Sequence, residues 1–178
     1  MRTLLIAVMM MLIGVLCSET VVYSDSLVRM AKKGNTQAQY DLAQCYYHAR
    51  GVKQNFKTAV KWYTKAAKKK HPEASYSLGL SYFLGEGVKK DYKKSAKWML
   101  SAAENRQRQA QNFMGWMYFN GDGVSQNYRQ ACFWWWVDHY AGNKEAYNDI
   151  RKLETELDKA EIEKCRLQAV KWLQKFDI

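Results

Sequence analysis

A repeat of 36 residues runs through this chain and constrains its fold more than any other feature. The repeat is recognised because the same residue types return at one spacing. The recurring positions are Ala38, Ala74, Ala110 and Ala146; Gly51, Gly87 and Gly123, each followed by valine; Tyr46, Tyr82 and Tyr118; and Trp62, Trp98 and Trp134. A period of this length without a strand pattern is typical of stacked helical hairpins. The sequence therefore predicts an all-α solenoid in which neighbouring repeats bury each other's apolar sides.

The middle repeat shows how each hairpin begins. Pro72 suits the first helical position, where its missing N–H costs nothing, and Glu73 favours the positive end of the helix dipole. Ala74 and Leu78 then begin one apolar stripe along the helix. Gly87 lies in a loop where a backbone with positive φ can close the helix. The first helix of each repeat is therefore expected to end near the Gly-Val pair.

The second helix of the middle repeat follows the Gly-Val loop. Asp91 is placed to cap this helix with a side-chain oxygen, and its equivalents in the neighbouring repeats are asparagines. Tyr92, Ser95 and Trp98 are predicted to face the core. In the first repeat, Ala49 stands where the other two repeats have glycine, which predicts a strained loop there.

Both ends of the repeat array depart from the pattern, as the outermost units of a solenoid usually do. Residues 24–33 predict a lone second helix before the first complete repeat. After the third repeat, a helix is expected from about Asp158 to Phe176. We therefore predict a right-handed α-solenoid of about three hairpins over residues 24–142, with C-terminal capping helices over residues 143–178.

The N-terminus carries the pattern of a targeting signal. Arg2 precedes thirteen apolar or small residues from Leu4 to Leu16, and a cysteine and a serine follow them. Thirteen helical residues rise about 20 Å, less than the roughly 30 Å of a bilayer core. Residues 1–18 are therefore predicted to be a secretory signal peptide, and the protein to be periplasmic or secreted in a bacterium. An uncleaved anchor and lipidation of Cys17 are the alternatives.

Removal of that segment leaves three cysteines, Cys45, Cys132 and Cys165. An odd number excludes a complete disulfide framework. Cys45 lies two repeats away from Cys132, too far for the Cα separation of less than about 7 Å that a disulfide needs. Cys132 and Cys165 could form a disulfide, but buried thiols that pack as small apolar groups are the favoured interpretation.

The positive charge is concentrated in the first two repeats. Residues 50–108 contain 15 Lys or Arg and 4 Asp or Glu, so this segment accounts for the whole net charge of +11. A solvated helix face is the simplest explanation. Attraction to an acidic partner or to an anionic membrane surface is the functional alternative. Nucleic acid is disfavoured as a partner, because the predicted signal directs the chain out of the cytoplasm.

The repeats resemble the Sel-one-like repeat family, a relative of the tetratricopeptide repeats. The matching segments are residues 38–52, 55–67, 74–103 and 110–135. In such proteins the first helices of the hairpins line a concave groove that binds protein partners. The resemblance implies a groove built from nine side chains: Tyr40, Gln44, Tyr47, Tyr76, Leu80, Phe83, Asn112, Trp116 and Phe119. Aromatic anchors of this kind suit a protein interface, and packing between hairpins is the alternative.

Residue patterns for catalysis or cofactor binding are missing from the sequence. The Gly-Val pairs follow helices rather than strands, so they do not form a phosphate-binding loop. His48, His71 and His139 lack a second ligand at metal-binding spacing. Of the consecutive tryptophans 134–136, which point about 100° apart on a helix, one continues the repeat and two are expected to seal the joint with the C-terminal helices. We expect no enzyme activity, no cofactor and no metal.

An exported, non-enzymatic protein-interaction module fits these features best. Two specific roles compete within that function: an immunity protein that blocks a toxic effector, and an envelope adaptor. Binding of anionic lipid or glycan through the lysine-rich repeats is an alternative from a different class. A hydrolase of the β-lactamase-like kind is disfavoured, because the cysteine-rich relatives linked to that activity carry paired cysteines in each repeat.

Overall fold

The computed structural model describes residues 21–176 of the 178-residue chain. The predicted signal peptide, with its alternatives of an uncleaved anchor or a lipidated Cys17, lies outside these residues. Within them, nine α-helices and one 3₁₀ helix follow one another, and no strand occurs. The prediction of an all-α fold is confirmed.

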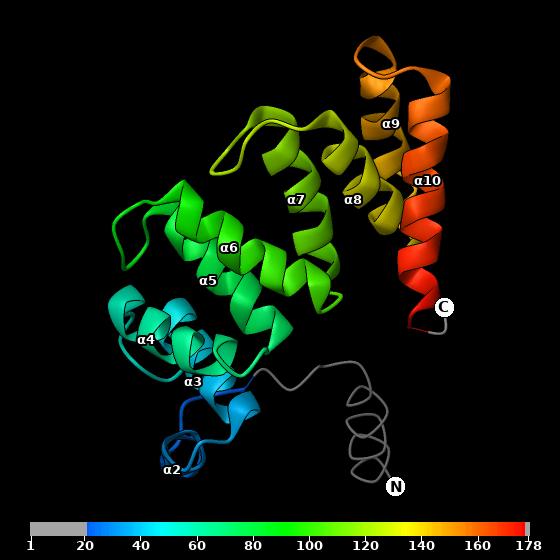
Figure 1. Cartoon of the computed structure of the whole chain (residues 1–178). Helices are drawn as coiled ribbons and strands as arrows, with labels where there is room; N and C mark the ends of the chain where they lie inside the picture. The colour runs from blue at the N-terminus through cyan, green and yellow to red at the C-terminus, as the bar shows by residue number, and fades with distance from the viewer. Residues whose placement is uncertain (1–20, 177–178) are drawn as a thin grey trace, which may run out of the picture.

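Three complete helical hairpins form the centre of the stack (Figure 1). The elements are α2 (Asp25–Lys32), α3 (Thr36–His48), α4 (Phe56–Ala67), α5 (Pro72–Leu84), α6 (Tyr92–Glu104), α7 (Arg108–Asn120), α8 (Tyr128–Tyr140), α9 (Ala146–Arg151), the 3₁₀ helix η1 (Lys152–Thr155) and α10 (Lys159–Gln174). The two helices of each hairpin pack on each other, and each hairpin packs on the next. The chain is therefore a right-handed α-solenoid of three hairpins, with α2 as the lone second helix before them.

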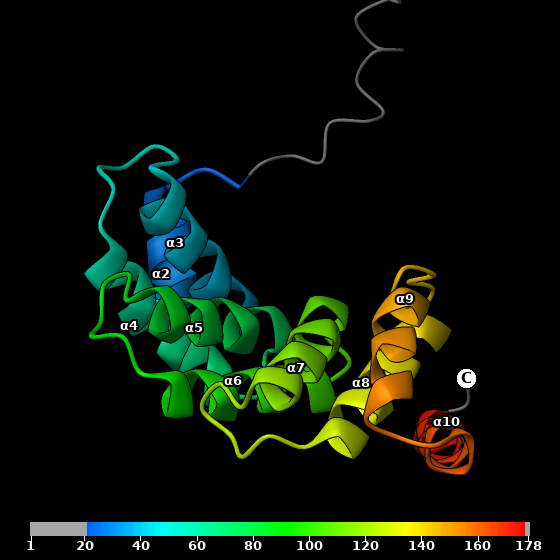
Figure 2. The ribbon, with the colours of Figure 1, turned by 90° about the horizontal axis from the view of Figure 1, so that it is seen from above.

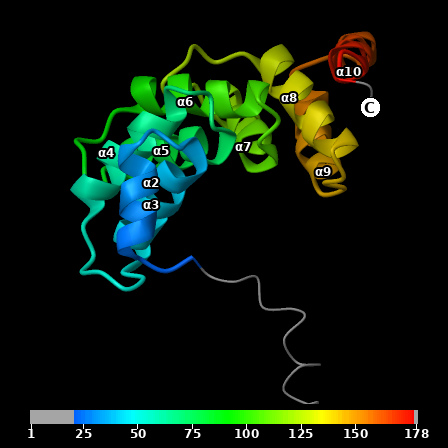
Figure 3. The same ribbon diagram turned by 90° about the horizontal axis from the view of Figure 1, so that it is seen from below.

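The stack curves into an arc with two unlike sides. In Figure 2, the first helices α3, α5 and α7 follow the inner side of the arc, and the second helices α4, α6 and α8 follow the outer side. Figure 3 shows α10 beside α8 at the far end of the arc. The inner side is the face on which the sequence placed the groove.

Helix ends are fixed by the residues that the sequence singled out. The side chains of Asn55, Asp91 and Asn127 each accept a hydrogen bond from a backbone N–H in the first turn of α4, α6 and α8. Gly85 closes α5 with a left-handed backbone at φ 83°. Ala49 adopts the same conformation at φ 58°, where a Cβ costs about 1–2 kcal/mol. The predicted strain in the first loop is present.

The glycines of the second and third Gly-Val pairs, Gly87 and Gly123, also make the joint between repeats. A Cβ on Gly123 would lie 2.0 Å from the carbonyl oxygen of Tyr92, and one on Gly87 would lie 2.4 Å from that of Phe56. Tyr92 and Phe56 are the first residues of α6 and α4. These two loops therefore touch the start of the preceding repeat's second helix, and only glycine fits there.

The repeat tryptophans differ in burial, which corrects one prediction. Trp134 is 4% exposed, whereas Trp62 and Trp98 are only half-buried. Trp98 packs against the core as predicted, but the expectation that it is buried within the core is wrong. The prediction for Tyr92, which is 38% exposed, is also wrong. Ser95 is buried as predicted. The physical reason is the position of α10, which packs along α8 and leaves α6 uncovered.

The C-terminal helices form an atypical fourth pair. The short helix α9 has six residues, and Ala146 and Ile150 are buried at the positions that continue the first-helix pattern. A capping box between Asp158 and Glu161 starts α10. This helix ends two residues before Phe176, which is 38% exposed. The expected C-terminal helix is confirmed, but its last predicted residue lies outside it.

The three consecutive tryptophans point in three directions, as helical geometry predicts. Each meets an aromatic ring on a different helix. The ring-centroid distances are 5.8 Å from Trp134 to Trp172 of α10, 5.6 Å from Trp135 to Trp116 of α7, and 6.0 Å from Trp136 to Tyr147 of α9. The repeat tryptophan itself therefore seals the joint with α10. Of the other two, only Trp136 faces a C-terminal helix.

Candidate functional site

The nine predicted groove residues lie on the first helices of the three hairpins. They come from α3, α5 and α7, three from each helix, and all nine are half-buried. Figure 2 shows these helices along the inner side of the arc. Half-buried side chains can pack against neighbours or contact a partner. Pockets help to separate the two cases, because five of the nine residues line two pockets between these helices.

The first groove pocket opens between α3, α4 and α5. Its volume is about 270 Å³, and its lining residues are Gln44, Tyr47, His48, Tyr63, Ser77 and Leu80. Gln44, Tyr47 and Leu80 are predicted groove residues. Tyr63 of α4 is 1% exposed, so it closes the bottom of the pocket. The pocket combines aromatic and aliphatic surface with a few polar atoms, which suits a side chain of a protein partner.

The rim of this pocket is tied to the next repeat. The hydroxyl of Tyr47 donates a hydrogen bond to Glu86, which lies in the loop after α5. Burial and this carboxylate raise the pKa of Tyr47 to about 12, so the hydroxyl keeps its proton at neutral pH. Burial lowers the pKa of His48, and Arg50 acts in the same direction. His48 is therefore mainly neutral at pH 7, and the rim gains no positive charge from it.

The second groove pocket opens between α5, α7 and the end of α8. Its volume is about 290 Å³, and its lining residues are Tyr76, Arg108, Gln109, Asn112, Phe113, Asp138 and Asn143. Tyr76 and Asn112 are predicted groove residues. Asp138 is 1% exposed and accepts hydrogen bonds from Asn112 and Asn143. Burial raises the pKa of Asp138, although the two amides and the positive charge of Arg108 oppose the shift.

Asp138 departs from the repeat pattern, although the pattern alone did not predict it as a site residue. The positions 36 and 72 residues earlier are Ala102 and Ala66, which are fully buried. An acid at a position that is otherwise a buried alanine breaks the repeat. Such a break marks a place where packing alone does not explain the residue.

The other four predicted residues pack between helices. Their ring contacts are Tyr40 with His71 at 4.9 Å, Phe83 with Phe113 at 5.0 Å, Phe119 with Tyr128 at 5.6 Å, and Trp116 with the Nζ of Lys152 at 4.7 Å from the ring centroid. The contacts of Tyr40 and Phe83 join neighbouring hairpins, that of Phe119 joins α7 to α8 within the third hairpin, and that of Trp116 joins α7 to η1. Packing between helices is therefore the better description of these four side chains.

The outer face carries the positive charge. The exposed lysines of α4 and α6 that have no acidic partner within the described part of the chain are Lys57, Lys61, Lys65, Lys93 and Lys97. In the third repeat, the equivalent of Lys93 is Arg129. The Nε of Arg129 donates to Glu161 of α10 at 3.0 Å. The helix α10 thus neutralises the positive charge at this position in the third repeat, whereas the equivalent lysines of the first two repeats keep their charge unpaired among the residues described.

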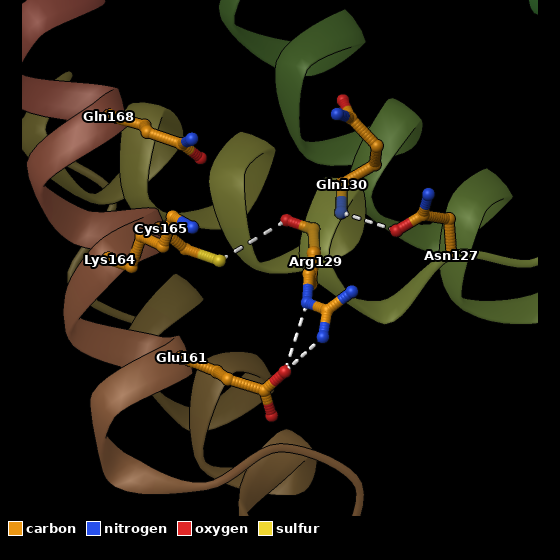
Figure 4. Close-up of a pocket in the computed structure, with 7 residues that line it drawn as sticks. All are labelled: Asn127, Arg129, Gln130, Glu161, Lys164, Cys165 and Gln168. Atoms are coloured by element: carbon orange, nitrogen blue, oxygen red, sulfur yellow. Dashed lines mark hydrogen bonds and ion pairs between the residues drawn. The ribbon is translucent and has the colours of Figure 1, made fainter.

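A larger pocket of about 410 Å³ lies on the outer side, where α10 meets α8 (Figure 4). The ion pair of Arg129 and Glu161 crosses it, and the Sγ of Cys165 lies 3.5 Å from the carbonyl oxygen of Arg129. Cys132 and Cys165 are buried thiols at this joint and form no disulfide. The Cys165 thiol beside it, together with burial, raises the pKa of Cys132. The ion pair and the thiol contact both tie α10 to α8, so we assign this pocket to the joint between the two helices.

No cluster of metal-ligating side chains assembles in residues 21–176. Groups of three or more His, Cys, Asp or Glu side chains that could hold a metal do not occur there. His71 is used for helix capping, because its Nδ1 accepts a hydrogen bond from the backbone N–H of Ala74 at 3.3 Å. Among the helices described, none combines the length and the apolar character needed to cross a bilayer.

Two solved structures with the same fold are more than 30% identical in sequence to this chain. A protective antigen present in uropathogenic Escherichia coli strains, which displays an SLR fold, is 39% identical, with a TM-score of 0.71 over 74% of this chain and 28% of that one. A Sel1 repeat protein from Oxalobacter formigenes is 31% identical, with a TM-score of 0.69 over 74% and 55%. The chain therefore spans about a quarter and about half of their lengths.

A more distant structure, cysteine rich protein B of Helicobacter pylori, supports the fold alone. It is 20% identical, with a TM-score of 0.55 over 69% of this chain and 88% of that one. No curated protein matches the chain. The Sel1 repeat model matches residues 36–71, 72–106 and 108–135, which correspond to the three hairpins. Because these matches cover more than half of the 178 residues, the chain belongs to the Sel1 repeat family.

Proposed function

We propose that this chain is an exported, non-enzymatic module that binds a protein partner in the groove formed by α3, α5 and α7. One observation carries the proposal: two pockets open on the inner side of the arc, and five residues that sequence reasoning placed in the groove line them. Folds of the Sel1 type typically serve as protein-interaction modules. The pockets supply the recessed contact points that such an interface needs.

The chemistry of the groove supports a protein partner over a small ligand. Tyr47, Tyr76 and Leu80 offer apolar surface beside the amides of Gln44 and Asn112. Aromatic side chains partly fixed by their neighbours lose little conformational freedom when they bind, and they often carry most of the energy of an interface. Two shallow pockets on neighbouring repeats suit successive side chains of one partner surface.

Two roles fit an exported binding module of this kind. It acts either as an immunity protein that blocks a toxic effector or as an envelope adaptor that joins two envelope proteins. A toxin or secretion gene beside this one would favour immunity. Protection of a sensitive strain by expression of this chain together with that toxin would then separate the two roles.

Groove variants test the proposal once a partner has been recovered from envelope extract. Tyr76→Ala and Leu80→Ala should each weaken the purified complex by about 2 kcal/mol or more, mainly through faster dissociation. Both side chains are half-buried, so the unfolding midpoint should change less than it does for a core substitution. Trp116→Ala is a poorer probe than the sequence suggested, because Trp116 packs on Trp135. Wild-type affinity of both pocket variants would exclude the groove.

The outer lysines favour a second candidate function, contact with an anionic lipid or glycan surface. Lys57, Lys61 and Lys97 are exposed without an acidic partner in the described part of the chain. Exposed charges are screened over about 8 Å at physiological ionic strength, so this binding should fall steeply with added salt. Changing Lys93, Lys94 and Lys97 to glutamate should abolish it. If the groove is the main site, the same change should slow association and leave dissociation nearly unchanged.

A further inference from the structure

The joint between one hairpin and the next involves three positions of the repeat, which recur every 36 residues. The first position lies on the first helix of a hairpin, and the second lies near the end of its second helix. The third position lies just before the first helix of the next hairpin. The three sets are Tyr40, Ala66 and His71; Tyr76, Ala102 and Gln107; and Asn112, Asp138 and Asn143. The first two joints combine a tyrosine with a buried alanine. The last joint combines two amides with a buried acid.

The polar set forms one hydrogen-bonded cluster. The Nδ2 of Asn112 donates to the Oδ2 of Asp138 at 2.9 Å, and the Nδ2 of Asn143 donates to the same oxygen at 2.6 Å. The other carboxylate oxygen, Oδ1, accepts no hydrogen bond from the residues described, yet it is not sealed from solvent. A carboxylate that is 1% exposed and keeps an open acceptor is costly unless a donor meets it.

This carboxylate lines the second groove pocket. The half-buried rings of Tyr76 and Phe113 form its aromatic walls, and the exposed side chains of Arg108 and Gln109 stand at its rim. The pocket therefore offers an anionic acceptor at the bottom and flat apolar surface along the sides. A planar cation with several N–H donors matches both features.

We propose that this pocket receives the guanidinium group of an arginine side chain of the protein partner, with the Oδ1 of Asp138 as hydrogen-bond acceptor. The inference rests on the proposed function, because it assigns the chemistry of one contact within the groove. Arg108 at the rim lowers the pKa of Asp138 by its positive charge, and because its side chain is exposed, water weakens its repulsion of an incoming guanidinium. The Arg108 side chain can donate to a backbone carbonyl of the same partner segment. The pocket would thus recognise an arginine within a peptide rather than a free cation.

The net charge of the chain does not oppose this contact. The unpaired lysines of α4 and α6 lie on the outer side of the arc, which these two helices follow (Figure 2). A helix with its side chains is about 10 Å across, and exposed charges are screened over about 8 Å at physiological ionic strength. The outer lysines therefore have little effect on the inner pocket, where Asp138 is the nearest acid.

The test uses the purified protein labelled with nitrogen-15 and two capped peptides, acetyl-Ala-Arg-Ala-amide and the same peptide with citrulline in place of arginine. Citrulline keeps the shape of arginine but carries no charge. The side-chain amide NMR signals of Asn112 and Asn143 report directly on the pocket. We expect the arginine peptide to shift both signals and to bind at least about tenfold more tightly than the citrulline peptide, the effect of one charge-assisted hydrogen bond.

Two variants separate binding from folding. Asp138→Asn keeps the size of the side chain and removes its charge, so it should remove the preference for arginine over citrulline. Asn112→Tyr combined with Asp138→Ala installs the residue pair of the first two joints, and it should abolish the shifts with either peptide. Asp122→Asn, in the loop after α7, is the matched control and should bind like the wild type.

The outcomes distinguish this inference from the proposed function. Equal binding of the two peptides, or an arginine preference that survives in Asp138→Asn, overturns it, as does tighter binding of a lysine peptide. If Tyr76→Ala and Leu80→Ala still weaken the natural partner while the arginine peptide does not bind, only this inference fails. If those groove variants leave the natural partner unaffected, the proposed function fails even where the arginine peptide binds.

Discussion

Trp98 and Trp134 occupy the same position in consecutive repeats, yet Trp98 is half-buried and Trp134 is 4% exposed. The hairpins around them share the same caps, glycine loops and apolar stripes. The difference lies in the helices that come next in the chain. A complete hairpin comes after α6, whereas the six-residue α9 comes after α8, and α10 then packs directly on α8.

This comparison shows that a repeat pattern fixes the place of a residue within its own hairpin but not what covers that hairpin. The outer side of α8 is part of the core because Trp172 and Cys165 of α10 cover it. The outer sides of α4 and α6 stay open and carry unpaired lysines. Two repeats therefore keep an outer surface, and the third uses the same surface for stability.

The largest expected effect comes from removing the covered tryptophan. Trp134→Ala should lower the free energy of unfolding by about 3–5 kcal/mol, through lost burial and the cavity that remains beneath α10. Trp98→Ala should cost less than about 2 kcal/mol, because its ring already contacts solvent. Urea unfolding of the two variants checks both values. Equal losses would mean that α10 does not cover α8 in solution.

Gly79 and Gly115 occupy equivalent positions in consecutive repeats, and they extend the comparison of the second and third repeats to the interior of the hairpins. A Cβ on Gly115 would lie 2.2 Å from the Nε1 of Trp135, a rigid and fully buried ring, so Gly115→Ala should cost about 1–3 kcal/mol. A Cβ on Gly79 would lie 2.9 Å from the Cγ of Met99, which is flexible. Gly79→Ala should be nearly neutral, since alanine also favours the helix by about 1 kcal/mol.

Ala43 serves as an internal control for that pair. It occupies the equivalent position in the first repeat and is fully buried there, so an alanine is accepted where the facing side chain allows it. Thermal unfolding of the two variants measures the difference. A larger loss for Gly79→Ala than for Gly115→Ala would contradict the packing of α7 on α8.

The smallest expected effect concerns the first loop. Ala49 has φ 58°, a conformation that glycine adopts in the other two repeats. Ala49→Gly should stabilise the protein by up to about 1 kcal/mol, because it removes a Cβ clash from the left-handed region. The reverse change, Gly85→Ala, should cost a similar amount. A loss of stability in Ala49→Gly would show that Ala49 is not strained in solution.

The sequence predicted those features of the fold that depend on a few neighbouring residues. The caps at Asn55, Asp91 and Asn127, the glycine loops and the hairpin order each follow from local pattern, and the structure confirms them. The burial of Trp98 depends on whether a distant helix covers it, which the repeat does not encode. The prediction that Trp98 is buried within the core failed for that reason.

The candidate site, like the fold, was predicted where neighbouring residues decide the structure and missed where distant segments meet. The repeat placed the groove residues on the first helices, because position within a hairpin is local information. The cluster of Asn112, Asp138 and Asn143 needs α7, the end of α8 and the turn before α9 at once. Two departures from the repeat marked it in the sequence: Asp138 replaces a repeated alanine, and Asn112 replaces a repeated tyrosine. Its hydrogen bonds and its pocket appear only when the three segments are placed together.

Site-specific photocrosslinking tests the central claim most directly, because it asks which side of the arc touches the partner. A benzophenone amino acid replaces His48, which is exposed at the rim of the first groove pocket, in one variant and Lys61 on the outer side of α4 in the other. In living cells, the groove variant should give a single protein adduct that disappears when Tyr76→Ala is added, and the outer variant should give none. An adduct from the Lys61 variant alone, unaffected by Tyr76→Ala, would contradict the assignment of the groove as the binding site.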